Sequence, residues 1–196
     1  MIGALLLARY NQQEDTAAQE AAVEVMPQPV EQILEHTAQE ETVAPEETSP
    51  QLQIPVELLT EEDKKMTEVE IDGHLYIGYL SIPGLKLDLP VMSGWNYTKL
   101  NIAPCRYSGS LRSQDMVIMA HNYSSHFGKL SRLKLGDQVQ FTDMDGGITL
   151  YEVVGKDILD PTAVVEMTSG DFDLTLFTCT YGGKDRVTVY CDMVKE

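Results

Sequence analysis

Cys179 is the residue of this chain whose type and position most directly suggest covalent chemistry. It ends the alternating run Leu174–Thr178, which predicts a half-buried strand, and polar or turn-forming residues follow it. A cysteine at the end of a strand can be exposed to a substrate, and its thiolate is a good nucleophile. A structural role is the competing explanation, because free cysteines are among the most buried residues in proteins.

Arg186 lies in the same part of the chain, just beyond the turn predicted by Gly182-Gly183. If the segments on either side of this turn form a hairpin, Cys179 and Arg186 face each other across it. A guanidinium keeps its proton, so it can donate hydrogen bonds and positive charge to a carbonyl oxygen that becomes negative. Spacing alone favours the alternative, a solvated arginine beside a turn.

His121 ends the continuous apolar run Met116–Ala120, which is typical of a buried strand. A cysteine thiol is mostly protonated near neutral pH. A nearby imidazole can activate it by accepting the proton, or as an imidazolium that stabilises the thiolate. It can later return a proton to a leaving amine. A structural histidine bonded to the backbone is the alternative, and His126 in the following loop is a rival candidate.

The elements that must position these residues are mostly strands. Short apolar or alternating runs bounded by turn signals predict the strands Tyr76–Ile82, Leu87–Val91, Met116–Ala120, Gln138–Thr142, Ile148–Ile158, Asp171–Thr178 and Val187–Val194. Helical turns are expected only at Asn96–Ile102 and Phe127–Leu133, and residues 159–170 form a connection without an obvious long helix. Many short strands with few helices indicate a mostly β fold, a compact barrel or sandwich.

No cofactor or metal is expected. The other two cysteines, Cys105 and Cys191, are interpreted as structural, and a disulfide between them is allowed by the sequence but not specified by it. No Cys/His cluster has the spacing of zinc ligands. Some carboxylates, namely Asp143, Asp145 and Glu166, could contribute to a calcium site, but they form no clear cluster.

The charge of the chain is unevenly distributed. The formal net charge is −17; residues 1–70 hold 16 acidic and 3 basic residues, and residues 71–196 hold 15 and 11. This balance argues against a nucleic-acid partner. Residues 10–67 are an acidic low-complexity segment that we interpret as a stalk or linker. The apolar Met1–Ala8 is too short to span a bilayer, which takes about 20 residues; it is either the end of a membrane anchor or an apolar terminus of no consequence.

The residues around Cys179 resemble a known family signature. Thr175-Leu176-Phe177-Thr178-Cys179-Thr180, with Arg186 opening the next strand, resembles the sortase signature TLxTC followed by an arginine. The segment around His121 is similar to the histidine segment of sortases, in which an F..L..L..GD pattern follows the histidine. Here that pattern is formed by Phe127, Leu130, Leu133 and Gly136-Asp137. Together with strand segments like those of the family, the similarity covers roughly residues 75 to 194.

The resemblance implies a closed β-barrel of about eight strands with short helices. It also implies that Cys179 attacks the Thr carbonyl of an LPxTG-like sorting signal to form a thioacyl enzyme, while His121 exchanges protons and Arg186 stabilises the carbonyl oxygen. An amine of a cell-wall precursor or a pilin lysine then resolves the intermediate. The partners are surface proteins with a C-terminal sorting signal, and the location is the extracytoplasmic face of the cell membrane of a Gram-positive bacterium.

The resemblance also suggests a domain plan. Residues 1–9 would be the remnant of an N-terminal membrane anchor, the stalk would lift the enzyme from the membrane, and residues 68–196 would be the catalytic domain. The His-Asn pair and the compact hairpin resemble class B or related clostridial-type sortases more than housekeeping ones. Ala120 stands where many sortases carry glycine.

Four further residues are candidates for substrate binding. Thr178 and Thr180 flank Cys179, and one of them can donate its backbone N–H to the carbonyl oxygen. Tyr181 and Tyr123 can line the groove, although surface packing explains each residue equally well. Two other functions remain open: another cysteine hydrolase or peptidoglycan transpeptidase with the same Cys179/His121 pair, and a non-catalytic β-barrel binding module.

Overall fold

The computed structural model describes Thr60 and residues 64–195. The expected anchor remnant and most of the expected stalk lie outside the described residues. Within the described part of the chain, no helix is both long enough and apolar enough to cross a membrane.

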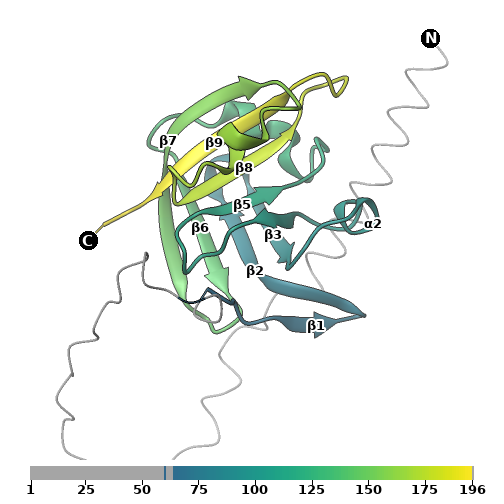
Figure 1. Ribbon diagram of the computed structural model, residues 1–196, viewed down its shortest axis with the longest axis vertical. Helices are drawn as coiled ribbons and strands as arrows, with labels where there is room; N and C mark the ends of the chain where they lie inside the picture. The colour runs from purple at the N-terminus through teal and green to yellow at the C-terminus, as the bar shows by residue number, and fades with distance from the viewer. Residues whose placement is uncertain (1–59, 61–63, 196) are drawn as a thin grey trace, which may run out of the picture.

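A closed β-barrel forms the body of the molecule (Figure 1). Eight strands follow one another around it, and a pairing between the first and last of them closes it. In spatial order they are β2 (His74–Ile82), β3 (Leu87–Met92), β4 (Cys105–Ser108), β5 (Met116–Met119), β8 (Leu174–Cys179), β9 (Arg186–Met193), β7 (Ile148–Leu159) and β6 (Gln138–Asp143). A ninth strand, β1 (Val69–Ile71), extends the sheet from β2. The expected mostly β barrel is therefore confirmed.

Two neighbouring pairs of strands are parallel, β3 with β4 and β5 with β8, and the other pairs are antiparallel. The sequence pattern did not reveal β4, because a strand of four residues is too short to give a clear periodic signal. Parallel neighbours are also invisible to such patterns, because periodicity describes single strands and not their partners.

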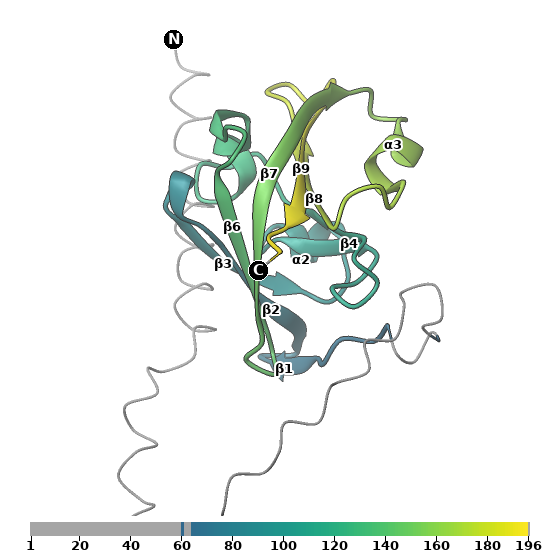
Figure 2. The same ribbon diagram turned by 90° about the vertical axis from the view of Figure 1, so that its left-hand side faces the viewer.

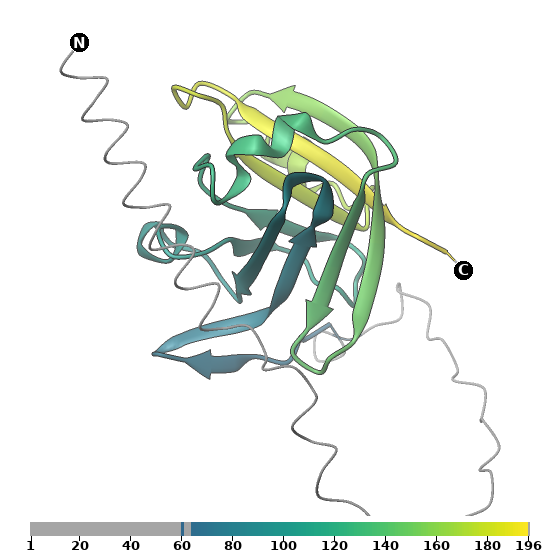
Figure 3. The same ribbon diagram turned by 180° about the vertical axis from the view of Figure 1, so that it is seen from behind.

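The barrel interior holds the main hydrophobic core. Alternate residues along each strand point inward, and these positions carry apolar side chains such as Leu80, Ile118, Phe141, Leu176 and Val189, all fully buried. The 3-10 helix η4 (Phe127–Arg132) lies against β8 and β9 and adds Phe127 and Leu130 to this core (Figure 3). The F..L..L pattern after His121 is thus explained by burial.

Short helices occupy the connections. The 3-10 helix η3 (Pro83–Leu85) lies between β2 and β3, and α2 (Tyr97–Leu100) lies between β3 and β4. The helix α3 (Val164–Thr168) is the only α-helix in the described part of the connection from β7 to β8, and it stands to one side of the barrel (Figure 2). Of these helices, η3 contacts β3, β6 and η4.

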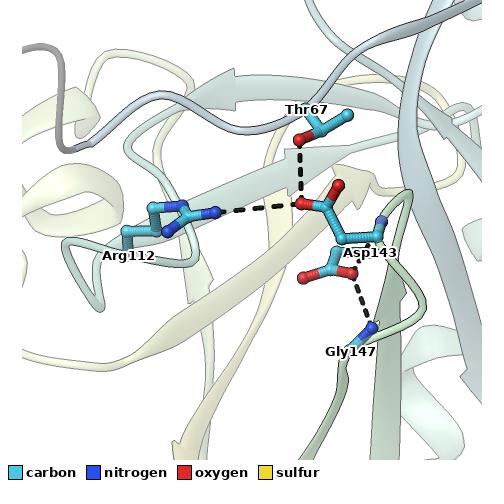
Figure 4. A network of polar contacts seen from close by, with 5 residues as sticks. Thr67, Arg112, Asp143 and Gly147 are labelled. Atoms are coloured by element: carbon cyan, nitrogen blue, oxygen red, sulfur yellow. Dashed lines mark hydrogen bonds and ion pairs between the residues drawn. The ribbon is translucent and has the colours of Figure 1, made fainter. Parts of the chain in front are cut away.

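The described N-terminal residues are fastened to the barrel by polar contacts (Figure 4). The Thr67 hydroxyl donates to Asp145 Oδ2 at 2.8 Å, and Arg112 Nη2 lies 3.8 Å from the same oxygen. Asp143 accepts from the backbone N–H of Gly147 at 2.7 Å and so shapes the β6–β7 turn that carries Asp145. Because these contacts are solvent-exposed, each contributes little to stability, about 0–1 kcal/mol for the ion pair.

Closure of the barrel depends on a close approach at Gly78. This residue pairs with Val91 of β3 and with Asp143 of β6, beside a bulge in β2. A Cβ atom there would clash with the Thr142 carbonyl oxygen and lie 2.7 Å from Cζ of Phe141. The seam between β2 and β6 therefore has room only for glycine.

Replacing Gly78 by Ala is expected to lower the free energy of unfolding by about 1–3 kcal/mol, because overpacking forces backbone shifts at the seam. Urea unfolding followed by circular dichroism measures the change. Gly94→Ala is the matched control, because nothing lies within 4 Å of a Cβ built at Gly94. Equal stability of the two variants would contradict this account of the seam.

Candidate active site

The parallel pairing of β5 with β8 brings His121 and Cys179 to the same edge of the sheet. The register pairs Met119 with Phe177, and each candidate follows its paired residue by two positions. Met119 and Phe177 pack together with Val117 in a small cluster separate from the barrel core. Because side chains alternate along a strand, His121 and Cys179 belong to this outer face. Both are partly buried.

Three hydrogen bonds hold the two strand ends together beyond the last ladder pair. The Ala120 N–H donates to the Phe177 carbonyl at 3.3 Å. The buried Thr178 hydroxyl donates to the Ala120 carbonyl at 2.8 Å, and the Asn122 amide donates to the Thr180 carbonyl at 3.3 Å. The residues on either side of His121 are therefore tied to the residues on either side of Cys179.

Arg186 is the direct cross-strand partner of Cys179 in the β8–β9 hairpin. Directly paired residues point to the same face of a sheet, so the guanidinium and the thiol share the outer face. Thr180 closes the turn: its N–H donates to the Asp185 carbonyl at 2.9 Å, and its hydroxyl accepts from the Asp185 N–H at 3.0 Å. Gly182 and Gly183 have φ of 93° and 75°, which favours glycine at both positions.

The Arg186 side chain is partly engaged by its own hairpin. Its Nη1 donates to the carbonyls of Gly183 and Asp185 at 3.3 and 3.1 Å. Within residues 64–195 its Nε and Nη2 atoms make no hydrogen bond, so three N–H groups can still reach a ligand. Nearby, hydrogen bonds from the Thr162 hydroxyl and backbone lower the pKa of Asp160, burial opposes this, and the charge of Arg186 adds to the lowering.

Asn101 and Tyr123 are among the neighbours that contact His121. Its Nε2 lies 3.0 Å from Oδ1 of Asn101, which follows α2. The ring of Tyr123 stacks on the imidazole, with centroids 4.7 Å apart and planes at 29°. The rival candidate His126 is completely buried beneath Tyr123 and does not line the cavity described next.

His121, Cys179 and Arg186 line one cavity of about 260 Å³. Its other walls are mostly apolar and come from the β3–α2 connection, β4, β5, β8 and the α3 region. They are formed by Trp95, Tyr97, Leu100, Tyr107, Met119, Ala120, Pro161, Val164, Met167, Phe177 and Thr178. A nucleophile and a cation from the β8–β9 hairpin and a base from the end of β5 thus face a single apolar space.

A row of aromatic rings forms one wall of this cavity. Tyr97 meets Trp95 edge-on at 6.1 Å, Trp95 stacks on Tyr107 at 5.7 Å, and Tyr107 meets Phe177 edge-on at 5.4 Å. Sequence analysis missed these wall residues and also Val164 and Met167, because their segments have no periodic pattern. The single tryptophan of the chain, in the polar segment Ser93–Asn96, was the one available signal.

The four other predicted site residues lie in different surroundings. Thr178 lines the cavity, with its hydroxyl bonded to Ala120. Thr180 shapes the hairpin turn, Tyr123 contacts His121, and Tyr181 is 85% exposed at the turn; none of these three lines the cavity. Their participation in substrate binding stays a prediction.

Cys105 and Cys191 differ from Cys179. All three cysteines are free, so the disulfide allowed by the sequence is not formed. Cys105 and Cys191 are completely buried, and burial raises the pKa of each thiol to about 12. Within the described residues no group of three or more His, Cys, Asp or Glu side chains is arranged to hold a metal ion.

Comparisons with known proteins match this chain to sortases. The family model of the sortase domain matches residues 80–194. Sortase C1 from Streptococcus suis is 28% identical, with a TM-score of 0.56 over 62% of this chain and 74% of that one. Sortase A from Corynebacterium diphtheriae is 24% identical, with a TM-score of 0.57 over 63% and 62%.

Sortase C from Clostridium perfringens SM101 is 22% identical, with a TM-score of 0.53 over 67% of this chain and 73% of that one. At this identity, as with the sortase A structure, the likeness concerns the fold alone. A search of curated proteins found no match.

Cysteine reactivity should separate the three thiols. Iodoacetamide at pH 8 is expected to alkylate Cys179 in the folded protein, while Cys105 and Cys191 stay protected. A thiol with a pKa of about 12 has only about one part in ten thousand as thiolate at pH 8. Peptide mass spectrometry locates the label, and unfolding in urea should release all three. Labelling of Cys105 or Cys191 in the folded protein as fast as Cys179 would contradict the assignment.

Proposed function

The chain belongs to the sortase family of cysteine transpeptidases, and from this premise we propose that it cleaves an LPxTG-like sorting signal and transfers it to an amine. The observation that carries the proposal is the shared cavity of Cys179, His121 and Arg186. A thiol nucleophile, an imidazole and a guanidinium around one space are the groups that acyl transfer through a thioester requires.

In the first half-reaction, the Cys179 thiol loses its proton to His121, and the thiolate attacks the Thr carbonyl of the signal. The carbonyl oxygen gains negative charge as the tetrahedral intermediate forms. Collapse of this intermediate breaks the Thr–Gly bond, and the protonated His121 donates its proton to the leaving amine. The products are a thioacyl enzyme and the released C-terminal fragment.

In the second half-reaction, the amine of a cell-wall precursor or a pilin lysine attacks the thioester. This amine loses a proton to His121, and the Cys179 sulfur leaves as a thiolate, which the imidazolium balances. A new amide bond joins the surface protein to its acceptor. Water in place of the amine would give hydrolysis instead.

Arg186 is proposed to stabilise the negative carbonyl oxygen in both half-reactions. Its Nε and Nη2 are the donors left after the hairpin carbonyls take Nη1. Those carbonyl contacts orient the guanidinium before substrate arrives, and a preorganised donor is more effective than one that must be ordered during reaction. The apolar cavity walls strengthen the effect, because electrostatic interactions are less screened away from water.

The cavity walls also suggest how the signal is recognised. Leu100, Met119, Val164 and Met167 offer an apolar surface that suits the apolar N-terminal residues of an LPxTG-like motif. Among the described residues of the cavity wall, Arg186 carries a permanent positive charge and none is a carboxylate. A cationic residue at the start of the motif would therefore lose its hydration without gaining a partner.

The family also supports a setting for this reaction. We propose that the enzyme is anchored in the cell membrane of a Gram-positive bacterium and acts on the extracytoplasmic face, with residues 10–67 as a spacer. Its partners would be surface proteins carrying a C-terminal sorting signal. The class B-like or clostridial-type assignment stays a prediction.

The reaction is tested with fluorogenic peptides carrying LPxTG-like and NPxTN-like motifs, with and without triglycine. We expect a thioacyl adduct on Cys179 by mass spectrometry and an amine-dependent ligation product. Cys179→Ala and His121→Ala should abolish ligation, and Arg186→Ala should lower kcat by about 10²–10³-fold, the usual effect of losing an oxyanion donor.

His74→Ala and Arg132→Ala are matched controls, because neither residue lines the cavity. Cleavage without triglycine transfer would favour a cysteine hydrolase. A folded protein with no adduct and no cleavage, whose Cys179→Ala variant behaves identically, would favour a binding module and overturn the proposal.

Motif recognition has its own test at Val164. Placing a carboxylate in the apolar wall with Val164→Asp should raise KM about tenfold or more for a peptide that begins with Leu. Val165→Asp is the control, because Val165 is 77% exposed and does not line the cavity. Equal KM values for the two variants would show that the motif binds elsewhere.

A further inference from the structure

We propose that Asp160 is a positioning residue: by bonding Thr162 it holds the turn that brings Pro161 and Val164 to the cavity, and it thereby tightens binding of the sorting signal. Its effect on the signal rests on the function proposed above, whereas its hold on the turn does not. The starting observation is a pair of hydrogen bonds, in which Asp160 Oδ1 accepts from the Thr162 N–H at 2.8 Å and from the Thr162 hydroxyl at 2.6 Å.

The segment that forms this part of the cavity wall is anchored at both ends. At one end, Leu159 is the last residue of β7 and pairs with Arg186 of β9. At the other end, Met167 is only 4% exposed and belongs to the small cluster that contains Phe177. Residues 160–163 between these anchors belong to no strand or helix. Their position therefore depends on the hydrogen bonds of the turn that they form.

Both the main chain and the side chain of Asp160 close this turn. The Ala163 N–H donates to the Asp160 carbonyl at 3.0 Å, which closes a turn of four residues. Aspartate is favoured at the first position of such turns and proline at the second, because the proline ring fixes φ. The carboxylate adds its two bonds to Thr162, so the backbone is held on both sides of Pro161.

Two residues near Asp160, Pro161 and Val164, line the cavity. The Val164 N–H donates to the Thr162 carbonyl at 2.8 Å, and the Thr168 hydroxyl donates to the Val164 carbonyl at 2.8 Å. Val164 is 40% exposed, so packing restrains it only in part. The position of Val164 is therefore linked by hydrogen bonds to that of Thr162, which Asp160 holds.

The carboxylate of Asp160 stays ionised in this turn. Hydrogen bonds from the Thr162 side chain and backbone lower its pKa, burial opposes this, and the charge of Arg186 lowers it further. An ionised carboxylate accepts hydrogen bonds more strongly than a neutral group does. Asparagine lacks the charge but has a carbonyl oxygen that makes the same kind of turn. Comparing aspartate with asparagine at this position therefore separates the effect of the hydrogen bonds from that of the charge.

Loosening this turn would weaken binding without changing the reacting groups. Cys179 and Arg186 belong to β8 and β9, and His121 follows β5, so the turn itself carries none of them. A wall that samples several positions must be ordered when the signal binds, which costs affinity. The loss applies to the ground state and the transition state alike, so KM should rise while kcat stays the same.

The test changes both ends of the hydrogen bond in the full chain and uses a peptide that begins with Leu. Asp160→Ala should raise KM about three- to tenfold with kcat within about twofold of wild type, whereas Asp160→Asn should change neither by more than about twofold. Thr162→Val loses only the hydroxyl bond and should raise KM about two- to threefold, and Thr162→Ser should keep the wild-type value. Combining Asp160→Ala with Thr162→Val should be no worse than Asp160→Ala alone, because both changes remove one interaction.

Binding is measured separately in a Cys179→Ala background, in which no turnover is expected. Trp95 is the only tryptophan of the chain and lines the same cavity, so its fluorescence should report peptide binding directly. The Kd values should follow the same order as the KM values. Asp157→Ala is the matched control, because it removes an exposed carboxylate of β7 that does not line the cavity, and it should leave KM and Kd unchanged.

The hold on the turn is tested without any peptide. Hydrogen exchange of the Ala163 and Val164 amides, followed by NMR, should be faster in Asp160→Ala and unchanged in Asp157→Ala. If the wild-type protein neither binds nor cleaves the peptides, the proposed function fails, and the exchange result still decides whether Asp160 holds the turn. Three results would overturn the proposal: unchanged exchange in Asp160→Ala, a loss of kcat without a rise in KM, or the full Asp160→Ala defect in Asp160→Asn, which would assign the effect to the charge.

Discussion

The parallel pairing of β5 with β8 is the constraint on which the site depends. In an antiparallel pair, the C-terminal ends of two strands lie at opposite edges of the sheet; in a parallel pair they coincide. His121 follows the end of β5 and Cys179 is the last residue of β8, so only parallel neighbours in this register bring them together. A slip of one residue would turn one side chain to the other face. The buried bond from Thr178 to Ala120 and the contact from Asn122 to Thr180 oppose such a slip.

The inner and outer faces of β5 and β8 have different roles. Met116, Ile118, Leu174 and Leu176 point into the barrel and belong to the main core, whereas Val117, Met119, Thr175 and Phe177 point outward. Stability therefore comes chiefly from the inner face, and the outer face is available for a ligand cavity. The outer apolar side chains are covered by α3 and by the row of aromatic rings from Tyr97 to Phe177. This arrangement partly shields His121 and Cys179 from water without burying them in the core.

Neutral groups are among the neighbours that contact the reactive side chains. Backbone carbonyls hold Arg186, an amide contacts His121, and a tyrosine stacks on it. By contrast, Cys105 and Cys191 are buried, and burial raises the pKa of their thiols, so we expect them to react slowly. The same residue type thus occupies two different environments in one barrel.

The sequence by itself indicated the strands with strong apolar patterns and the Cys179–Arg186 hairpin, because each of these leaves a local signal, and its resemblance to sortases singled out the three candidate residues. Alternation marked β8, a Gly-Gly turn marked the hairpin, and an apolar run marked β5. Only the tertiary structure decided that β5 and β8 are parallel neighbours, that β4 exists, and that Trp95, Val164 and Met167 form walls around Cys179. It also decided that Asn101, twenty residues before His121, bonds to the imidazole. These are pairings between distant segments, and the energy that selects them is the burial of shared surface, which no single segment encodes.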